Sequence, residues 1–254
     1  MNASLPQEMQ SHTYPLMYEV EGSHWWFVGR RAILESFLKQ IVEKIRSPQS
    51  AIRILDVGCG TGANLEMLGK FGEASGVDVS ADALEFCRKR GLSQVKQGLA
   101  EDLPFAEESF DLVTALDVVE HLDDDVAGLK EMRRILRKGG RALFFVPAFM
   151  FLWGVQDDVS NHRIRYTKKQ ITERLRRAGF EIERATYANI TFFAPILAGR
   201  TLMKLTGIKP ESENNVNVSA LNPILGKFFG AERFWLKNFN FPFGVSIVVV
   251  AKKN

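Results

Sequence analysis

Apolar residues recur along this chain with two alternating spacings, one typical of helices and one typical of buried strands. Over residues 30–45 they fall three and four positions apart, which predicts a helix with one buried face. Over residues 52–148, short apolar runs such as ILDVG, SGVDV and FDLVTAL alternate with longer amphipathic stretches. Strands that alternate with helices in this way predict a mostly parallel sheet covered on both faces.

One of these stretches, residues 123–140, predicts a long helix. It begins with three aspartates, carries basic residues toward its end and is followed by Gly139 and Gly140. Acid at the start and base at the end suit the helix dipole, and glycine commonly terminates a helix. After residue 147 the pattern predicts a helix over 167–179, a strand over 181–189 and a closing strand over 244–252.

Composition narrows the class of protein only modestly. The chain has 254 residues, of which 46% are hydrophobic and 25% charged, and this is ordinary for a globular protein. A net charge of +3 is too small to indicate a nucleic-acid partner. The two cysteines, Cys59 and Cys87, stand in unrelated contexts, so we expect no disulfide framework and no metal site. We expect a cytoplasmic protein, because no signal peptide and no apolar run of membrane-spanning length is evident.

The stretch ILDVGCGTGANL is the most informative part of the chain. Asp56 ends a predicted strand, and Gly58, Gly60 and Gly62 follow at every second position before a helix. Glycines permit a tight turn and a close approach of backbone to a ligand. Sixteen residues beyond Gly62, Asp78 ends the next strand, where a carboxylate can accept hydrogen bonds from both ribose hydroxyls. The pattern therefore predicts a nucleoside-binding half of a doubly wound fold.

The spacing of the glycines indicates which nucleoside. A dinucleotide site typically reads G-x-G-x-x-G, whereas this loop reads G-x-G-x-G with an acid two residues before it. An acid beside the loop repels a pyrophosphate but suits a ligand that carries an ammonium and a sulfonium. A nicotinamide-dependent oxidoreductase is therefore the weaker of the enzyme alternatives.

On these residues the chain resembles the class I S-adenosylmethionine-dependent methyltransferases, particularly the type 11 group. The motifs LDVGCGTG, GVDVS, AEDLPFAEESFDLV, DVVEHLDD and RRILRKGGRALFFVP occur in the expected order over residues 52–148. The resemblance implies an α/β, Rossmann-like doubly wound sheet of about seven strands, mostly parallel with the last strand antiparallel. It also implies S-adenosylmethionine as cofactor and S-adenosylhomocysteine as product. A non-catalytic module that binds the same cofactor is the alternative.

The resemblance implies cofactor-binding roles residue by residue. The three glycines would line the methionine part and Asp56 would orient their loop, while Asp78 would hold the ribose. The other implied contacts are Val79 and Ala100 near the adenine, Glu101 beside them, and Asp117 at the sulfonium and the substrate. The chain departs from the family at Leu99, where an acid usually takes the adenine amino group, and Glu101 and Asp102 are the candidates to replace it.

Two further motifs resemble a bacterial and archaeal subgroup of these enzymes, associated with surface-polysaccharide or lipid-linked glycan pathways. The first is HWWFVGR, which contains Trp25, Trp26, Phe27 and Arg30. We expect its aromatics either to form the underside of a lid over the cofactor or to staple the first helix to the sheet. The second motif comprises Leu152, Trp153, Asp157, His162, Arg165 and Tyr166, of which Trp153, Arg165 and Tyr166 are further candidates for substrate contact.

Two histidines are candidates for a general base, His121 beside the predicted cofactor edge and His162 after the fifth strand. Residues 190–240 are rich in Phe, Leu and Pro, which suits a pocket for an apolar acceptor, a dimer surface, a peripheral membrane contact or a plain insertion over the sheet. We therefore expect a helical lid over 1–48, a cofactor-binding core over 49–189, a helical insertion over 190–240 and the last strand over 241–254. The expected acceptor is small or lipid-linked and not nucleic acid, and the expected assembly is a monomer or homodimer.

Overall fold

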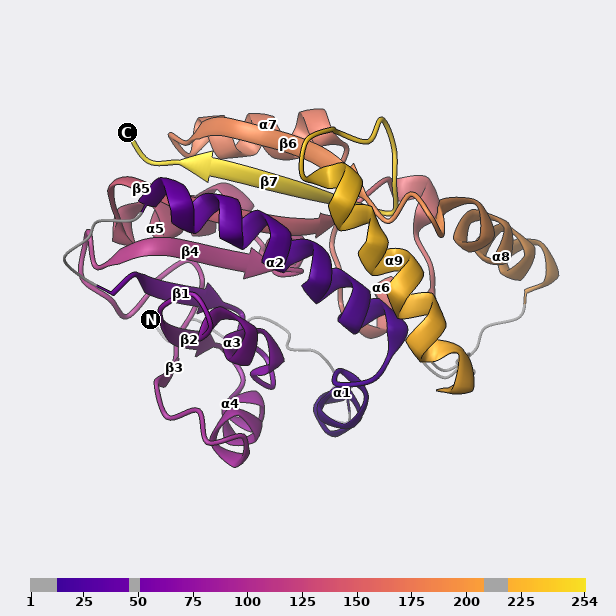
Figure 1. The fold of residues 1–254 in the computed structure, drawn as a ribbon, viewed down its shortest axis with the longest axis horizontal. Helices are drawn as coiled ribbons and strands as arrows, with labels where there is room; N and C mark the ends of the chain where they lie inside the picture. The colour runs from indigo at the N-terminus through magenta and orange to yellow at the C-terminus, as the bar shows by residue number, and fades with distance from the viewer. Residues whose placement is uncertain (1–12, 46–50, 208–218) are drawn as a thin grey trace.

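A central β-sheet organises the part of the chain that the computed structural model describes, residues 13–45, 51–207 and 219–254 (Figure 1). Its strands, in chain order, are β1 (Arg53–Val57), β2 (Glu73–Asp78), β3 (Val95–Gln97), β4 (Phe110–Leu116), β5 (Leu136–Pro147), β6 (Glu181–Ala188) and β7 (Ser246–Lys252). They lie in the spatial order β3-β2-β1-β4-β5-β7-β6. Strands β1 to β5 are parallel, and β7 runs antiparallel to both β5 and β6. The predicted sheet of about seven strands, mostly parallel with the last strand antiparallel, is confirmed.

The helices form layers on both faces of this sheet. In chain order they are α1 (Thr13–Val20), α2 (Trp25–Ile45), α3 (Ala63–Leu68), α4 (Ala81–Lys89), α5 (Asp125–Ile135), α6 (Val155–Val159), α7 (Lys168–Arg177), α8 (Phe193–Thr206) and α9 (Asn222–Leu236). Buried side chains of α5 and α7 form one hydrophobic core with the sheet, and those of α2, α3, α4 and α9 form the other. Along β5, Phe144 enters the first core and its neighbour Phe145 the second, as strand alternation requires.

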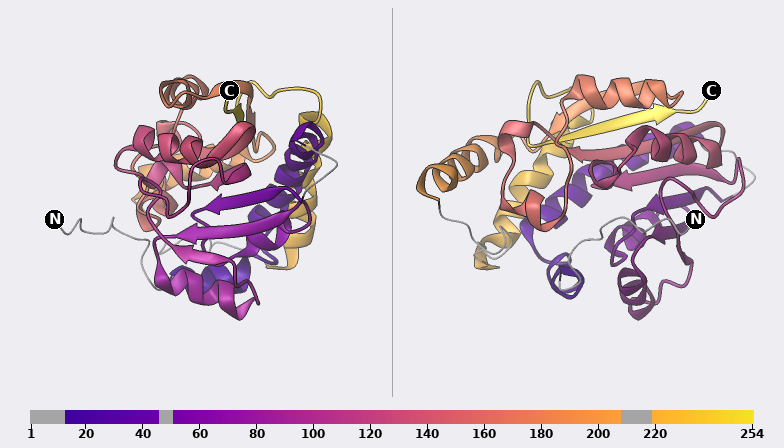
Figure 2. Two further views of the ribbon diagram at one scale, coloured as in Figure 1. Left: turned by 90° about the vertical axis from the view of Figure 1, so that its left-hand side faces the viewer. Right: turned by 180° about the vertical axis from the view of Figure 1, so that it is seen from behind.

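Helices α2 and α9, almost 200 residues apart in the sequence, pack side by side (Figures 1 and 2). Their crossing is close because small residues stand at it. A Cβ atom added to Gly29 of α2 would lie 2.5 Å from a ring carbon of Phe229, and one added to Gly230 would lie 3.1 Å from Ala32. The insertion before the last strand therefore returns to cover the first long helix.

Two helix boundaries differ from the prediction. Helix α5 ends at Ile135, and the residues expected to continue it belong to β5, because buried Leu136 pairs with Phe110 of β4. The pairing then shifts register before Leu112 meets Arg141, and this irregularity holds the two glycines. Helix α2 begins at Trp25 rather than Arg30, so the aromatic motif lies within it.

The sheet reverses its direction of winding between β1 and β4. Strands β2 and β3 lie on one side of β1, and β4 and β5 on the other. In open α/β sheets, ligands bind outside the carboxyl ends of the strands at such a switch point. Across residues 13–45, 51–207 and 219–254, no helix combines the length and apolar character that crossing a membrane requires. The division into lid, core and insertion stays a prediction, although α2 itself contributes buried side chains to a core of the sheet.

Candidate functional site

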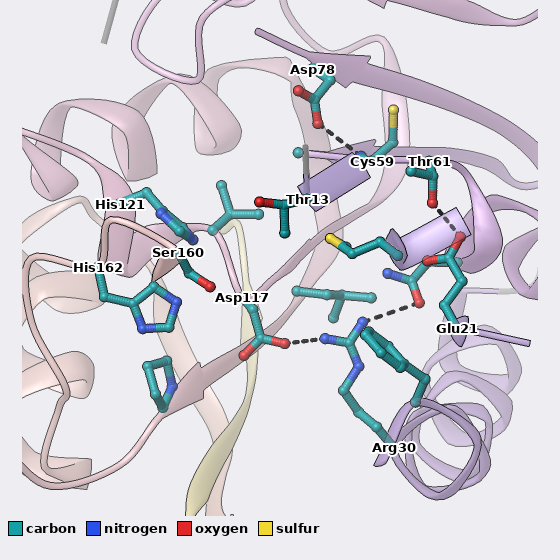
Figure 3. Close-up of a pocket in the computed structure, with 18 of the residues that line it drawn as sticks. Thr13, Glu21, Arg30, Cys59, Thr61, Asp78, Asp117, His121, Ser160 and His162 are labelled. Atoms are coloured by element: carbon teal, nitrogen blue, oxygen red, sulfur yellow. Dashed lines mark hydrogen bonds and ion pairs between the residues drawn. The ribbon is translucent and has the colours of Figure 1, made fainter. Parts of the chain in front are cut away.

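A cavity of about 420 Å³ lies at the carboxyl ends of β1, β2 and β4. Pockets that hold small ligands and cofactors typically measure about 300–1,000 Å³. The residues after these three strands form its floor, and helices α1, α2, α6 and α8 supply its other walls. Figure 3 shows Asp78 and Thr61 on one side of it, His121 and His162 on another, and Arg30 beside Asp117.

The glycine loop has the backbone that its sequence requires. Gly58, Gly60 and Gly62 all have positive φ angles, of 68°, 53° and 94°, which other residues rarely adopt. A Cβ atom at Gly58 would lie 2.4 Å from a methyl group of Val118, whereas one at Gly60 would meet no atom within 4 Å. Gly58 and Gly60 line the cavity, while Gly62 precedes α3 and lies against Leu92 instead.

Asp56 lies beneath this loop and outside the lining of the cavity. It is almost fully buried and accepts a hydrogen bond of 2.5 Å from the hydroxyl of Thr114. Burial raises the pKa of Asp56 to about 7, against the opposing effect of that hydrogen bond. Its predicted role of supporting the loop agrees with this position.

Asp78 is held at the mouth of the loop by two backbone groups. Its Oδ2 accepts a hydrogen bond of 2.8 Å from the amide of Gly60, and its Oδ1 accepts one of 2.9 Å from the amide of Ser80. Asp78 and Val79 both line the cavity. Strand β2 therefore presents a carboxylate beside the glycine loop, which is the arrangement that binds a ribose.

The next segment of the lining contains the departure from the family pattern. Leu99, Ala100 and Glu101 all line the cavity, and Asp102 does not. Of the two candidates to replace the missing acid, only Glu101 thus reaches the cavity wall. Burial raises the pKa of Glu101 above its ordinary value.

Arg30 and Asp117 form an ion pair at the centre of the cavity (Figure 3). Asp117 follows β4 with a positive φ of 60°, an uncommon conformation that often marks a functional site. Arg30 also donates a hydrogen bond of 3.2 Å to Asn64, and its guanidinium carbon lies 4.8 Å from the ring centroid of Trp26. Helix α2 is thereby fixed to the end of β4.

The aromatic residues of the first motif both line the cavity and pack against other elements. Trp25, Trp26 and Phe27 all contribute to the lining. The ring of Trp25 lies 4.6 Å from that of Phe192 and 6.0 Å from that of Phe229, as measured between centroids. These contacts agree with both predicted roles of the aromatic residues, which are to cover the cofactor as a lid and to anchor α2 by packing. Both roles stay predictions.

Asp157 holds His162 in place on the opposite wall. The carboxylate of Asp157 lies 2.8 Å from Nδ1 of His162, accepts a hydrogen bond of 2.7 Å from Arg165 and lies 3.5 Å from Arg200. Burial opposes its ionisation, but the bond to His162 and the two guanidinium charges lower the pKa of Asp157 to about 2. The carboxylate is therefore charged and fixes the orientation of the His162 ring.

The two candidate bases lie together but differ in environment. The rings of His121 and His162 are 4.7 Å apart, and both residues line the cavity. Burial, followed by the charge of His162, lowers the pKa of His121 to about 3. A general base works best with a pKa near the working pH, so this lowered pKa makes His121 the poorer candidate.

Glu120, His121 and His162, here called the histidine cluster, have ligand atoms within 4.8 Å of one another. Three such groups could share a metal ion. Burial raises the pKa of Glu120 well above its ordinary value, with a further contribution from the charge of Asp117. The expectation of a metal-free site stays a prediction.

Two predicted contact residues lie outside the cavity lining. Tyr166 is fully buried, and its hydroxyl donates a hydrogen bond of 2.8 Å to Asp125, so it belongs to the core beneath α5. Trp153 donates a hydrogen bond of 2.9 Å from its indole nitrogen to Asp158. A direct role of these two side chains in binding is therefore not supported by their positions.

Sequence reasoning missed two charged residues of the lining, Glu21 and Arg200. Glu21 precedes the aromatic motif, accepts a hydrogen bond from Thr61 in the glycine loop and pairs with Arg90 at 2.6 Å. Arg200 reaches Asp157 from α8. The only sequence signal for Arg200 was its position as the one arginine in the apolar run of α8. Nothing in the sequence indicated Glu21.

The fold and this site define a doubly wound α/β domain with a nucleoside cavity at its switch point. Residues 55–144 match the family described as a methyltransferase domain. The glycine loop and Asp78 lie within this match, and together they support a class I S-adenosylmethionine-dependent methyltransferase domain over these residues.

Two curated proteins similar to this chain are named as methyltransferases. A demethylmenaquinone methyltransferase of Bacillus velezensis is 37% identical over 110 residues, which cover 39% of this chain and 47% of the relative. O-methyltransferase rstn1 of Aspergillus nomiae is 34% identical over 116 residues, or 42% of this chain and 51% of the relative. The chain thus spans about half the length of these relatives.

A solved structure shares the fold. It is phosphoethanolamine N-methyltransferase 2 of Haemonchus contortus in complex with S-adenosyl-L-methionine, which matches with a TM-score of 0.53 and 19% identity. The match covers 85% of this chain and 52% of the other.

Proposed function

We propose that this protein transfers a methyl group from S-adenosylmethionine to a small-molecule or lipid-linked acceptor, such as a glycan or a prenyl-type compound. The observation that carries the proposal is the carboxylate of Asp78, oriented beside a glycine loop with three positive φ angles at the switch point of the sheet. The matched family and the relatives support the reaction class, and their names, which include a demethylmenaquinone and an O-methyltransferase, support more than one class of acceptor.

The residues present fit this cofactor. A Cβ atom at Gly60 would meet no atom within 4 Å, so a ligand can approach the backbone of the loop closely at this residue. Asp78 would hold the ribose hydroxyls, Gly58 and Gly60 would border the methionine part, and Ala100 would lie near the adenine. When bound, the cofactor supplies a methyl group on a sulfonium that is open to in-line displacement.

The chain itself supplies a base and a dry environment. Asp157 binds Nδ1 of His162, so Nε2 is the nitrogen that can take a proton from an acceptor hydroxyl or amine. Trp26 and Phe27 in the cavity wall exclude water from the reacting atoms and present aromatic faces that attract a cation. Asp117 would border the sulfonium, with Arg30 setting its position.

We also propose that the protein works in the cytoplasm, as a monomer or homodimer, and that its acceptor is not nucleic acid. An apolar acceptor is supported by the wall that α8 contributes through Ile196. The acceptor would enter between the aromatic start of α2 and this helix.

Calorimetric titration with S-adenosylhomocysteine tests the cofactor site. We expect the unaltered protein to bind and Asp78→Ala to bind about 10²–10⁴-fold more weakly, because two hydrogen bonds to a charged group are each worth about 1.5–3 kcal/mol. Asp82→Ala, which removes an exposed acid four residues away, is the matched control and should bind normally. Absence of binding by the unaltered protein would refute the proposal.

Transfer itself is tested with cofactor labelled in its methyl group and an extract of metabolites and lipids. The unaltered protein should label a product, and His162→Gln should bind S-adenosylhomocysteine normally but label at least about tenfold more slowly, in line with the loss of a general base. A protein that binds the cofactor and labels nothing would be the non-catalytic module. Hydride transfer to a nicotinamide would instead indicate an oxidoreductase.

A further inference from the structure

The outer face of α9 carries an apolar stripe that the rest of the described chain leaves uncovered. Leu221, Ile224, Phe228, Ala231 and Trp235 follow one another three and four positions apart, which places them on one side of a helix. Four of them are large, and their exposed fractions are 45% for Leu221, 54% for Ile224, 62% for Phe228 and 53% for Trp235. A surface helix normally turns such a stripe inward, whereas α9 also buries its opposite face against α2.

The stripe continues beyond the helix as an aromatic patch. The ring centroid of Trp235 lies 4.9 Å from that of Phe239, which is also exposed, and 6.3 Å from that of Phe241. Phe234, beside Trp235, is 70% exposed. Exposed apolar patches of this kind usually mark a surface that binds a partner.

The exposed charges of the segment that carries the stripe have a single sign; at 100° per residue Lys227 lies beside the stripe, whereas Arg233 and Lys237 lie on other sides of the helix. In residues 219–243 the exposed charged side chains are Lys227, Arg233 and Lys237, and the one acid, Glu232, is buried. The guanidinium carbon of Arg233 lies 4.8 Å from the ring centroid of Phe234, so cation and aromatic belong to the same surface. Glu232 accepts hydrogen bonds from the amides of Asn189 and Thr191 and does not face outward.

The same helix is in contact with the wall of the cavity on its inner side. Its first residue, Asn222, accepts a hydrogen bond of 3.3 Å from the amide of Trp25, and Phe229 packs against the ring of Trp25. Figures 1 and 2 show α9 outside α2, on the side of the molecule away from the sheet. A partner on α9 would therefore sit one helix away from the entrance that we propose for the acceptor.

We propose that the outer face of α9 binds the surface of an anionic lipid bilayer. Aliphatic and phenyl side chains of the stripe would enter the boundary between headgroups and acyl chains, where tryptophan is also favoured. Lys227, at the edge of the stripe, would lie against the lipid phosphates. This surface deepens the proposed function, because it would place the cavity beside a lipid-linked acceptor, but lipid binding itself does not require methyl transfer.

The charges favour a bilayer over a second copy of the chain. A two-fold contact through α9 would bring the same face of each copy together, and Lys227 of each copy would enter the contact with no exposed acid of this segment to pair it. Like charges across an interface oppose association. An anionic membrane satisfies both the apolar stripe and the lysine beside it.

Vesicle flotation tests the surface with full-length protein and no cofactor. The unaltered protein should bind vesicles of phosphatidylcholine with about 30% phosphatidylglycerol and bind pure phosphatidylcholine much less, because anionic lipid attracts basic residues. Lys227→Gln, which removes the cation beside the stripe, should weaken partition into anionic vesicles about fivefold. Phe228→Gln combined with Trp235→Gln should remove binding that persists at high salt, since apolar insertion is not screened.

Arg176→Gln combined with Arg177→Gln is the matched control. These two exposed cations lie on α7, which covers the opposite face of the sheet, and their loss should change partition by less than about twofold. The proposal is overturned if the unaltered protein ignores anionic vesicles or if the α9 and α7 variants bind them equally. It is also overturned if the α9 substitutions convert a dimer to a monomer without changing lipid binding. Titration of every sample with S-adenosylhomocysteine reports separately on folding and on the proposed function.

Discussion

Replacement of Asp157 by asparagine gives a strong test of how the wall around His162 is held. The carboxylate is 1% exposed, and two buried arginines depend on it, Arg165 at 2.7 Å and Arg200 at 3.5 Å. Its Oδ2 also accepts a hydrogen bond of 2.8 Å from the amide of Gly154. Asparagine keeps the shape but removes the negative charge that these two buried guanidinium groups share. Breaking a buried ion pair in this way costs about 3–5 kcal/mol.

The size of the effect can be followed by thermal and urea unfolding. For a protein of this size each kcal/mol lowers the melting temperature by about 2–4 °C, so Asp157→Asn should lower it by roughly 6–20 °C. The matched control is Asp158→Asn, at the exposed neighbour that accepts a hydrogen bond from Trp153, and it should cost about 1 kcal/mol or less.

The cost should also depend on pH. The pKa of Asp157 is about 2 in the fold, against an ordinary value of 3.8. The unfolded chain therefore binds the proton more tightly, and the carboxylate contributes stability above pH 4 that is lost as pH falls toward 2. The difference in pKa corresponds to about 2.5 kcal/mol, of which roughly half remains at pH 3. A cost below about 1 kcal/mol at pH 7, or one equal at pH 7 and pH 3, would contradict the assigned network.

Three further predictions use other parts of the molecule. Gly29→Ala should destabilise the protein by about 1–3 kcal/mol in urea unfolding, because the new methyl group would overlap Phe229; Gly199→Ala in α8, where a Cβ meets nothing, should instead stabilise by up to about 1 kcal/mol. The pKa of Asp56 is raised to about 7, so the fold binds its proton between pH 4 and pH 7 and stability falls as pH rises through that range; Asp56→Asn should remove this slope from the unfolding curves. Chelation with EDTA should leave methyl transfer unchanged, and a loss restored by added metal would show that the histidine cluster holds an ion.

The fold and the cofactor side of the cavity could be predicted because they depend on local features of the sequence, such as glycines that permit positive φ angles. Three glycines before a helix required positive φ angles, and Asp78 could be placed because the carboxyl ends of neighbouring parallel strands meet at one edge. The end of α5 could not be placed in this way. Residues 136–138 have helical composition, but pairing of Leu136 with β4 decides their structure.

The other walls depend on contacts between distant parts of the chain. Glu21 meets Thr61 across 40 residues and Arg200 meets Leu152 across 48, and no local pattern encodes either contact. The motif around His162 named candidate residues but did not predict the directions of their side chains. Arg165 enters the cavity wall, while its neighbour Tyr166 turns to Asp125 in the core.

Substitutions of the charged groups of the cavity wall differ in whether they change stability, chemistry or both. Asp117, Asp157 and Glu21 each pair with an arginine, so a variant at any of them changes the stability of the wall as well as its chemistry. His162 contributes its Nδ1 to this network and keeps Nε2 toward the groups around the cavity, where Glu120 lies 3.8 Å away. Glutamine at position 162 can still donate a hydrogen bond to Asp157 but cannot take up a proton near neutral pH. His162→Gln is therefore the variant that best distinguishes a loss of chemistry from a loss of structure, because its methyl-transfer rate can be compared with its affinity for the cofactor.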